Sequence, residues 1–176
     1  DNAGAQRAHE LYRHPDPAGL EPLVGSRRMW ERGPDDPDAL EVRVGTGPTT
    51  LCTPINVPDS GATEDLDPVC AVSMRQAIKA VGTVPDMPVV IQLQAFRFLS
   101  FTGDNARDTV RALVMQLALA HGPETIGIEA IGGEWEWLKW LPHTREPDKA
   151  RFRIVLVDAL LTTGTEDFFH GDSYTT

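Results

Sequence analysis

The residues whose types and spacing could support chemistry lie at the ends of two apolar runs. Gly103, Asp104 and Asn105 separate one such run from a segment with helical periodicity, which is where phosphate-binding loops occur in nucleotide-binding folds. Asp158 ends the other run, RIVLVD, from which a terminal carboxylate could reach Mg²⁺. These four residues would form a nucleotide site if a cation were present to neutralise the phosphates.

The cation is missing from this loop. A G-x-x-x-x-G-K-[ST] loop requires a lysine directly after its second glycine, and no lysine in this chain follows a glycine. Asp104 would instead place a negative charge beside a bound phosphate. We therefore interpret Gly103, Asp104, Asn105 and Asp158 as a vestigial nucleotide site, with no catalytic residue and no metal. The alternative is a divergent Mg²⁺-dependent nucleotide hydrolase that holds phosphate at the helix N-terminus after Gly103 and Mg²⁺ at Asp158.

A tryptophan-rich stretch, WEWLKWLPH, is the most unusual local feature of the sequence. Its Trp135, Trp137 and Trp140 either pack a short helix onto a sheet or leave a ring for a partner, and the pattern leaves both alternatives open. We take Trp135 and Trp137, together with Trp30, as the candidate partner-contact residues.

The elements that must position these residues alternate between helix and strand. Helical periodicity and capping residues predict helices, whereas runs of β-branched and aromatic residues predict strands. Helices are predicted over residues 3–13, 68–81 and 134–141, and in a further segment that begins near Asn105. Strands are predicted over residues 40–45, 89–93, 97–102, 125–131 and 153–158. This alternation predicts an α/β domain with a mainly parallel sheet and helices on both faces.

The predicted helix 68–81 carries an apolar face that we expect to be buried. Cys70, Met74, Ala77, Ile78 and Val81 recur at helical spacing on that face. The chain has 2 cysteines, Cys70 and one in the preceding loop, and we expect both thiols to be reduced and buried. Their spacing matches no zinc pattern and leaves a disulfide open.

The overall charge limits the classes of partner. With 16 basic and 26 acidic side chains, the chain has a net charge of −10, which phosphate backbones would repel, so nucleic-acid binding is disfavoured. No apolar run approaches the roughly 18 residues that a membrane-spanning helix requires. The first residues, DNAGAQRAHE, are polar and lack an initiator Met, so we expect a segment of a longer protein.

Four stretches, taken in order, carry a family resemblance. They are HPDPAGLEPLVGSRRMWERGPDDPDALEVRVG (14–45), EDLDPVCAVSMRQAI (64–78), TGDNARDTVRALVMQLALAHGPE (102–124) and WEWLKWLPH (135–143). Together they resemble EccC, the family of membrane-anchored ATPases of mycobacterial type VII (ESX) secretion systems, which is part of the FtsK/SpoIIIE family. The resemblance covers nearly the whole chain. It points to the region between the transmembrane helices of that family and its first ATPase module.

The resemblance implies a degenerate P-loop ATPase-like (Rossmann-like) domain, in which residues 1–14 end a stalk helix and residues 15–176 form the domain itself. ATP and Mg²⁺ would belong to the later ATPase modules, so no cofactor is expected here. The implied role is that of a non-catalytic connector on the cytosolic face of the plasma (inner) membrane. Its implied partners are other ESX membrane-core subunits and the following ATPase modules. Nucleic acid is not among them, and the membrane would be reached only through transmembrane helices outside this chain.

Overall fold

The computed structural model describes residues 2–53 and 68–158 of the chain. The chain divides into two compact units. Unit 1 comprises Asp1–Glu21 and Glu41–Leu113, and unit 2 comprises Pro22–Leu40 and Val114–Thr176. The boundary between the units falls inside helix α3 (Ala106–Ala120). None of the described helices combines the length and the hydropathy of a membrane-spanning segment.

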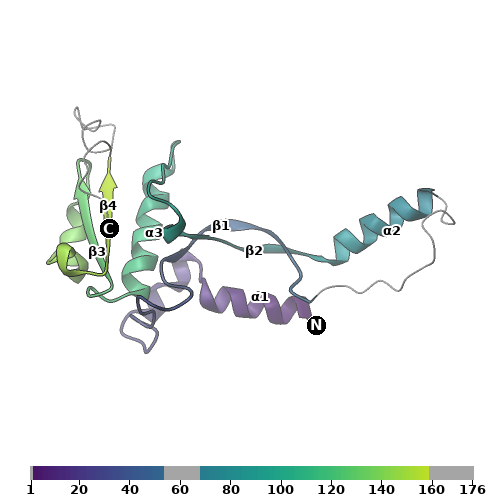
Figure 1. Cartoon of the computed structure of the whole chain (residues 1–176), viewed down its shortest axis with the longest axis horizontal. Coiled ribbons are helices and arrows are strands. Elements are labelled where there is room, and N and C mark those ends of the chain that lie inside the picture. Colours follow the sequence, from purple (N-terminus) through teal and green to yellow (C-terminus); the bar gives the residue numbers. More distant parts are fainter. Residues whose placement is uncertain (1, 54–67, 159–176) are drawn as a thin grey trace. The chain divides into compact units, whose positions relative to one another are not determined.

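A long two-stranded ribbon forms the centre of unit 1 (Figure 1). Strands β1 (Glu41–Thr50) and β2 (Thr83–Gln92) pair antiparallel over their whole lengths, with register shifts near Gly45 and Gly47. The strands predicted over 40–45 and 89–93 are therefore confirmed, and both are longer than predicted. The extra residues are stabilised by pairing with the opposite strand rather than by their own propensity.

Helix α1 (Asn2–Arg13) confirms the helix predicted over 3–13, and it lies along the ribbon of unit 1. The amide of Gln6 donates a hydrogen bond to the Thr50 carbonyl at 3.0 Å, and the guanidinium of Arg7 donates to the Pro85 carbonyl at 2.6 Å. At the other end of the helix, Arg13 pairs with Glu41 at 3.1 Å. Contacts along its length thus join α1 to both strands.

Helix α2 (Pro68–Val81) confirms the predicted helix but not the predicted burial of its apolar face. Val81 is 70% exposed, and Met74 and Cys70 are also exposed. Cys52 and Cys70 are both free thiols at the surface, so the expectation of buried cysteines is wrong. The periodicity of the helix correctly predicts one apolar face, but periodicity cannot show whether another element covers that face.

Unit 2 contains a short parallel sheet and most of the apolar core. Strands β3 (Ile126–Ile131) and β4 (Phe152–Val157) pair in parallel and confirm the strands predicted over 125–131 and 153–158. Val114 and Leu117 of α3, Ile126 and Ile128 of β3 and Leu138 are all buried. The predicted helix 134–141 is instead the 3₁₀ helix η4 (Glu136–Trp140), followed by η5 (Pro142–Thr144) and η6 (Pro147–Lys149). The proline that begins each of the last two helices has no N–H to continue an α-helix.

The described residues therefore form an α/β structure with two small sheets, one antiparallel and one parallel. This differs from the single, mainly parallel sheet that the sequence predicts. The strand predicted over 97–102 is wrong, because this segment joins no sheet among the described residues. Its β-branched and aromatic residues favour a strand, but a strand also requires a neighbour with which to pair.

Candidate functional site

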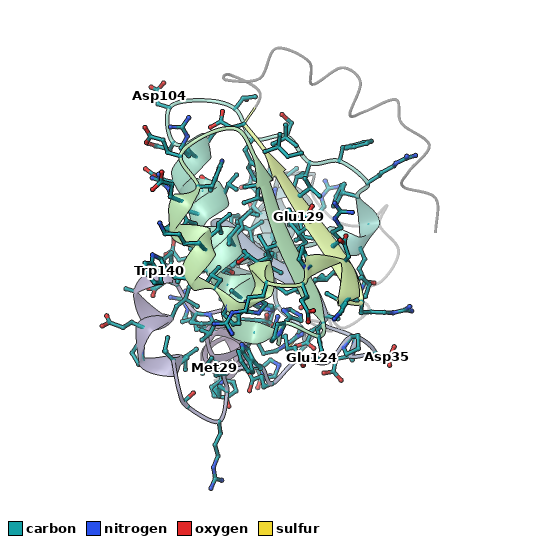
Figure 2. The ribbon with its side chains drawn as sticks, turned by 90° about the vertical axis from the view of Figure 1, so that its left-hand side faces the viewer. Met29, Asp35, Asp104, Glu124, Glu129 and Trp140 are labelled. Atoms are coloured by element: carbon teal, nitrogen blue, oxygen red, sulfur yellow. The ribbon has the colours of Figure 1, made fainter. Side chains whose placement is uncertain are left out.

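The predicted phosphate loop is an open turn in unit 1 that leads into α3. Gly103 has a φ of 103°, which favours glycine, and its carbonyl accepts the Ala106 N–H at 3.1 Å. The Asn105 carbonyl accepts the N–H of Thr109 at 2.9 Å as the first bond of the helix. Asp104 is exposed at the tip of the turn (Figure 2). The turn thus places a carboxylate where a phosphate loop would have a cation.

Asp158 lies in unit 2, just after β4, beside the turn that follows β3. Its N–H donates to the Ile131 carbonyl at 3.1 Å and continues the ladder by one residue. A Cβ atom on Gly133 would lie 2.7 Å from Asp158 Oδ2 and 2.6 Å from Trp135 Nε1. The Asp158 carboxylate and the Trp135 indole therefore both pack against Gly133, where a side chain would not fit. The structure brings Asp158 together with Trp135, while Gly103, Asp104 and Asn105 lie in the other unit.

The described residues offer no metal centre. In residues 2–53 and 68–158, no group of three His, Cys, Asp or Glu side chains could hold a metal ion.

Trp30 is held at the C-terminal end of α3 by a set of hydrogen bonds that we call the clasp. The last turn of a helix leaves carbonyl groups without intrahelical partners. Trp30 supplies its indole N–H to the Ala118 carbonyl at 3.1 Å and its backbone N–H to the Leu119 carbonyl at 2.8 Å. The backbone N–H of Arg32 donates to the next carbonyl, that of Ala120, at 3.0 Å. Residues 30–32 thus cap three successive carbonyls, and Trp30 remains 41% exposed.

Two buried histidines extend the clasp into the core of unit 2. The Leu40 N–H donates to His121 Nε2 at 3.1 Å, so the proton of that ring is on Nδ1, which lies 3.2 Å from the Leu117 carbonyl. His143 Nε2 lies 2.8 Å from the His121 carbonyl and therefore carries the proton of its own ring. Burial lowers the pKa of both histidines below the usual value, against a smaller opposing effect of these carbonyls.

One of these histidines, His143, also packs against the candidate contact residue Trp30. The rings of Trp30 and His143 meet edge to face, with centroids 6.2 Å apart. Neither histidine could be predicted as a functional residue, because an isolated His in a loop gives no spacing signal. Only its position after the last helical residue Ala120 could have suggested a capping role for His121.

The tryptophans of η4 divide between core and surface. Trp135 is only 8% exposed, and Trp137 is half-buried 6.4 Å from it, centroid to centroid. Trp140 is 79% exposed, with the Lys139 ammonium 5.6 Å from its ring centroid (Figure 2). Of the predicted contact residues, Trp30 has a substantially exposed ring and Trp135 does not. Trp140 was not among the contact residues predicted from the sequence, yet it is the most exposed aromatic residue in the described part of unit 2.

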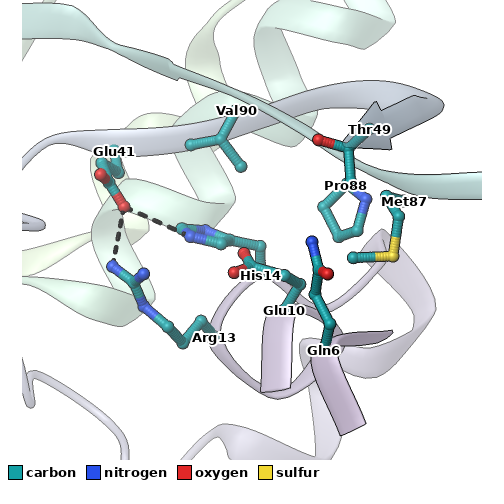
Figure 3. Close-up of a pocket in the computed structure, with 9 residues that line it drawn as sticks. All are labelled: Gln6, Glu10, Arg13, His14, Glu41, Thr49, Met87, Pro88 and Val90. Atoms are coloured by element: carbon teal, nitrogen blue, oxygen red, sulfur yellow. Dashed lines mark hydrogen bonds and ion pairs between the residues drawn. The ribbon is translucent and has the colours of Figure 1, made fainter. Parts of the chain in front are cut away.

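A pocket of about 210 Å³ in unit 1 lies between α1 and the ribbon (Figure 3). Glu41 is its most connected side chain, because one carboxylate oxygen lies 3.1 Å from the Arg13 guanidinium and 3.3 Å from His14 Nε2. His14 is buried, and its carbonyl accepts a hydrogen bond from Arg43. The cluster joins the end of α1 to β1 by charge and hydrogen bonding, and it contains no arrangement of nucleophile and base. No sequence pattern predicts this cluster, because its members lie in two distant segments.

Comparisons with known proteins identify relatives of the chain. The ESX secretion system protein EccC of Thermomonospora curvata is 38% identical over 152 residues, which are 82% of this chain and 12% of that protein. The ESX-3 secretion system protein EccC3 of Mycobacterium tuberculosis is 36% identical over 154 residues, 84% of this chain and 12% of the relative. The ESX-4 secretion system protein EccC4 of the same species is 37% identical over 153 residues, 83% of this chain and 12% of the relative.

The chain therefore spans only 12% of the length of these relatives. No protein-family model matches it. The resemblance stated from the sequence is confirmed by the named relatives and by the extent of the match. The chain is thus a homologue of one segment of the EccC proteins of ESX secretion systems.

Proposed function

We propose that this chain is the connector segment of an EccC protein. It would join the membrane core of an ESX system to the ATPase modules during protein secretion, on the cytosolic face of the membrane. It would do so without hydrolysing nucleotide, as a degenerate P-loop ATPase-like domain. The homology to EccC proteins supports the place of the chain in ESX secretion.

The surroundings of Asp158 carry the proposal that the segment is not a hydrolase. A carboxylate that binds Mg²⁺ must face a site that admits the ion and the phosphates. Asp158 instead packs against Gly133 beside the buried indole of Trp135. The open turn at Gly103 offers Asp104 in place of a lysine. These two observations support the proposal that the segment does not hydrolyse nucleotide.

The exposed tryptophans of unit 2 support a role in protein contacts. Trp30 and Trp140 combine exposed aromatic surface with supports that fix their positions, namely the clasp for Trp30 and η4 for Trp140. Aromatic residues held in this way are typical anchors of protein interfaces. We assign the principal contacts to Trp30 and Trp140. Trp135 and Trp137 would act indirectly, by packing η4.

The contact role is tested in the EccC polypeptide that carries this segment. Trp30→Ala and Trp140→Ala should each weaken co-purification of EccC with the other ESX membrane subunits. The matched control is Val24→Ala, since Val24 is a 65% exposed apolar residue of the same unit. Equal recovery of the subunits with all three variants would contradict the contact role.

The hydrolase alternative is tested on this chain itself. The connector proposal predicts no ATP turnover above a blank reaction with Mg²⁺ present. Turnover that is lost in Asp158→Ala but kept in Asp148→Ala, an exposed acidic control, would establish the alternative.

A further inference from the structure

We propose that the free edge of β4 is an interaction surface that takes one more β-strand. The strand would come from a part of the EccC polypeptide outside this chain, and it would lie parallel to β4. The inference rests on the hydrogen-bond pattern of β4, on its sequence and on the charge of the chain. It does not depend on the connector role.

The pairing of β3 with β4 fixes which backbone groups of β4 point outward. Phe152 donates to Thr125 at 2.9 Å and Asp158 donates to Ile131 at 3.1 Å, with an unbroken parallel register between them. In a parallel pair every second residue bonds to the same neighbour. Ile154 and Leu156 therefore face β3, whereas Val155 and Val157 turn their N–H and C=O groups to the opposite edge.

The outward groups of these two valines have no partner in the described part of the chain. Among the described residues, no hydrogen bond is formed by the backbone groups of Val155 or Val157, because the bonds to β3 are made by the alternate residues of β4. The other strand of the sheet is more enclosed, because Ile128 of β3 is fully buried and the backbone of η6 lies against Gly127. Within residues 2–53 and 68–158, the open edge of this sheet is thus the β4 edge.

The sequence of β4 is typical of an internal strand rather than an edge strand. Phe152, Ile154 and Leu156 occupy one face, and Val155 and Val157 occupy the other, so both faces are apolar. Edge strands usually carry a proline, a bulge or a free charge that prevents further pairing. The one charge in β4, Arg153, is held by Glu129 and Asp148 of the same unit. Parallel sheets of two strands are also rare, since parallel strands are normally enclosed on both sides.

The charge of the chain and the length of its relatives indicate where the strand comes from. Two copies of this chain would each bring a net charge of −10, which opposes pairing of one β4 with another. The relatives contain far more polypeptide than the matched segment, because that segment is 12% of their length. A strand from that remaining polypeptide completes the sheet without joining two strongly acidic chains.

Hydrogen exchange at single backbone amides tests the inference. In this chain alone, Val155 and Val157 should exchange at least about tenfold faster than Ile154 and Leu156, which serve as controls within the same strand. In the full EccC polypeptide, exchange at the two valines should slow about 100-fold or more, while the controls change little.

Three results would overturn the inference. Unchanged exchange at Val155 and Val157 in the full polypeptide would show that no strand is added there. Slow exchange of both valines in this chain alone, independent of its concentration, would show that the edge is already paired from within. Protection that rises with the concentration of this chain alone would show that a second copy is the partner.

Discussion

The two buried histidines of unit 2 predict that its stability falls as the pH is lowered through the range below 6.5. His121 accepts the Leu40 N–H on Nε2, and a proton on that nitrogen would abolish the bond. His143 Nδ1 is buried without a hydrogen-bond partner, so a proton there would leave a buried N–H unpaired. Both rings are therefore neutral in the folded protein, and burial lowers the pKa of each below its ordinary value of 6.5.

The sign of the effect follows from proton counting. Each histidine has a lower pKa in the folded chain than in the unfolded chain. At a pH between these two values, the unfolded chain binds the proton and the folded chain does not. The stabilisation is fully present above pH 6.5 and is lost as the pH falls toward the folded pKa. Each histidine contributes a slope of at most about 1.4 kcal/mol per pH unit, so the pair contributes at most about 2.7 kcal/mol per unit. The charge of Arg32 lowers the pKa of His121 further, and the charge of Asp38 opposes that effect. The charge of Glu124 partly opposes the lowering of the His143 pKa by burial.

Urea unfolding followed by tryptophan fluorescence measures this slope with a signal from unit 2, because all 4 tryptophans of the chain lie there. The free energy of unfolding would be compared at pH 7.5, 6.5 and 5.5 for the wild type, His121→Gln and His143→Gln. Glutamine does not titrate, and it can accept the Leu40 N–H at position 121 or donate to the His121 backbone carbonyl from position 143. Each variant should therefore lose up to one histidine's share of the slope. An equal pH dependence in the wild type and both variants would refute the reasoning.

Three further predictions concern single side chains. Gly133→Ala should destabilise unit 2 by about 2–4 kcal/mol, because the new side chain adds left-handed backbone strain and clashes with Asp158 and Trp135. Its control is Gly25→Ala, since Gly25 has a φ of 73° but open space around it. This control should cost only about 1–2 kcal/mol in the same urea experiment. Trp30→Phe removes the indole donor to Ala118 and should cost about 1 kcal/mol, while Trp140→Phe at the exposed position should change stability by less than about 0.5 kcal/mol. Glu41→Gln should destabilise unit 1 by about 1 kcal/mol and so lower its thermal midpoint, because Arg13 and His14 lose their shared carboxylate. A midpoint equal to that of the wild type would mean that the cluster contributes nothing to stability.

Local sequence signals predicted most helices and strands of this chain correctly. Pro68 begins α2, and the apolar runs before Asp158 and around Ile128 form β4 and β3. Each of these signals lies within the element itself, through capping or periodicity. The chain could therefore be divided into elements from its sequence alone.

Pairing and burial could not be predicted in the same way. Residues 97–102 have the composition of a strand but join no sheet among the described residues, and the apolar face of α2 is exposed. Both outcomes depend on contacts between distant segments, which local patterns do not encode. The clasp and the two histidines beside it show the same limit, because Trp30, His121 and His143 come from three separate segments and none carries a motif.

The candidate nucleotide residues were predicted from their positions after apolar runs, and the structure adds what surrounds them. Asp158 directly follows β4, as the apolar run before it predicts. The packing of Asp158 against Gly133 and Trp135, however, depends on a turn in which the glycines at 132 and 133 are left-handed. The sequence contains this Gly-Gly pair. Its relation to Asp158 appears only when β3 and β4 are seen to pair in register.

Calorimetric titration of this chain with Mg²⁺–ATP is the most direct test of whether the segment lacks a working nucleotide site. A connector that lacks the loop lysine, and whose Asp158 packs against Gly133, should release no binding heat up to millimolar nucleotide. Micromolar binding that is abolished by Asp158→Ala would contradict the account and establish a working nucleotide site.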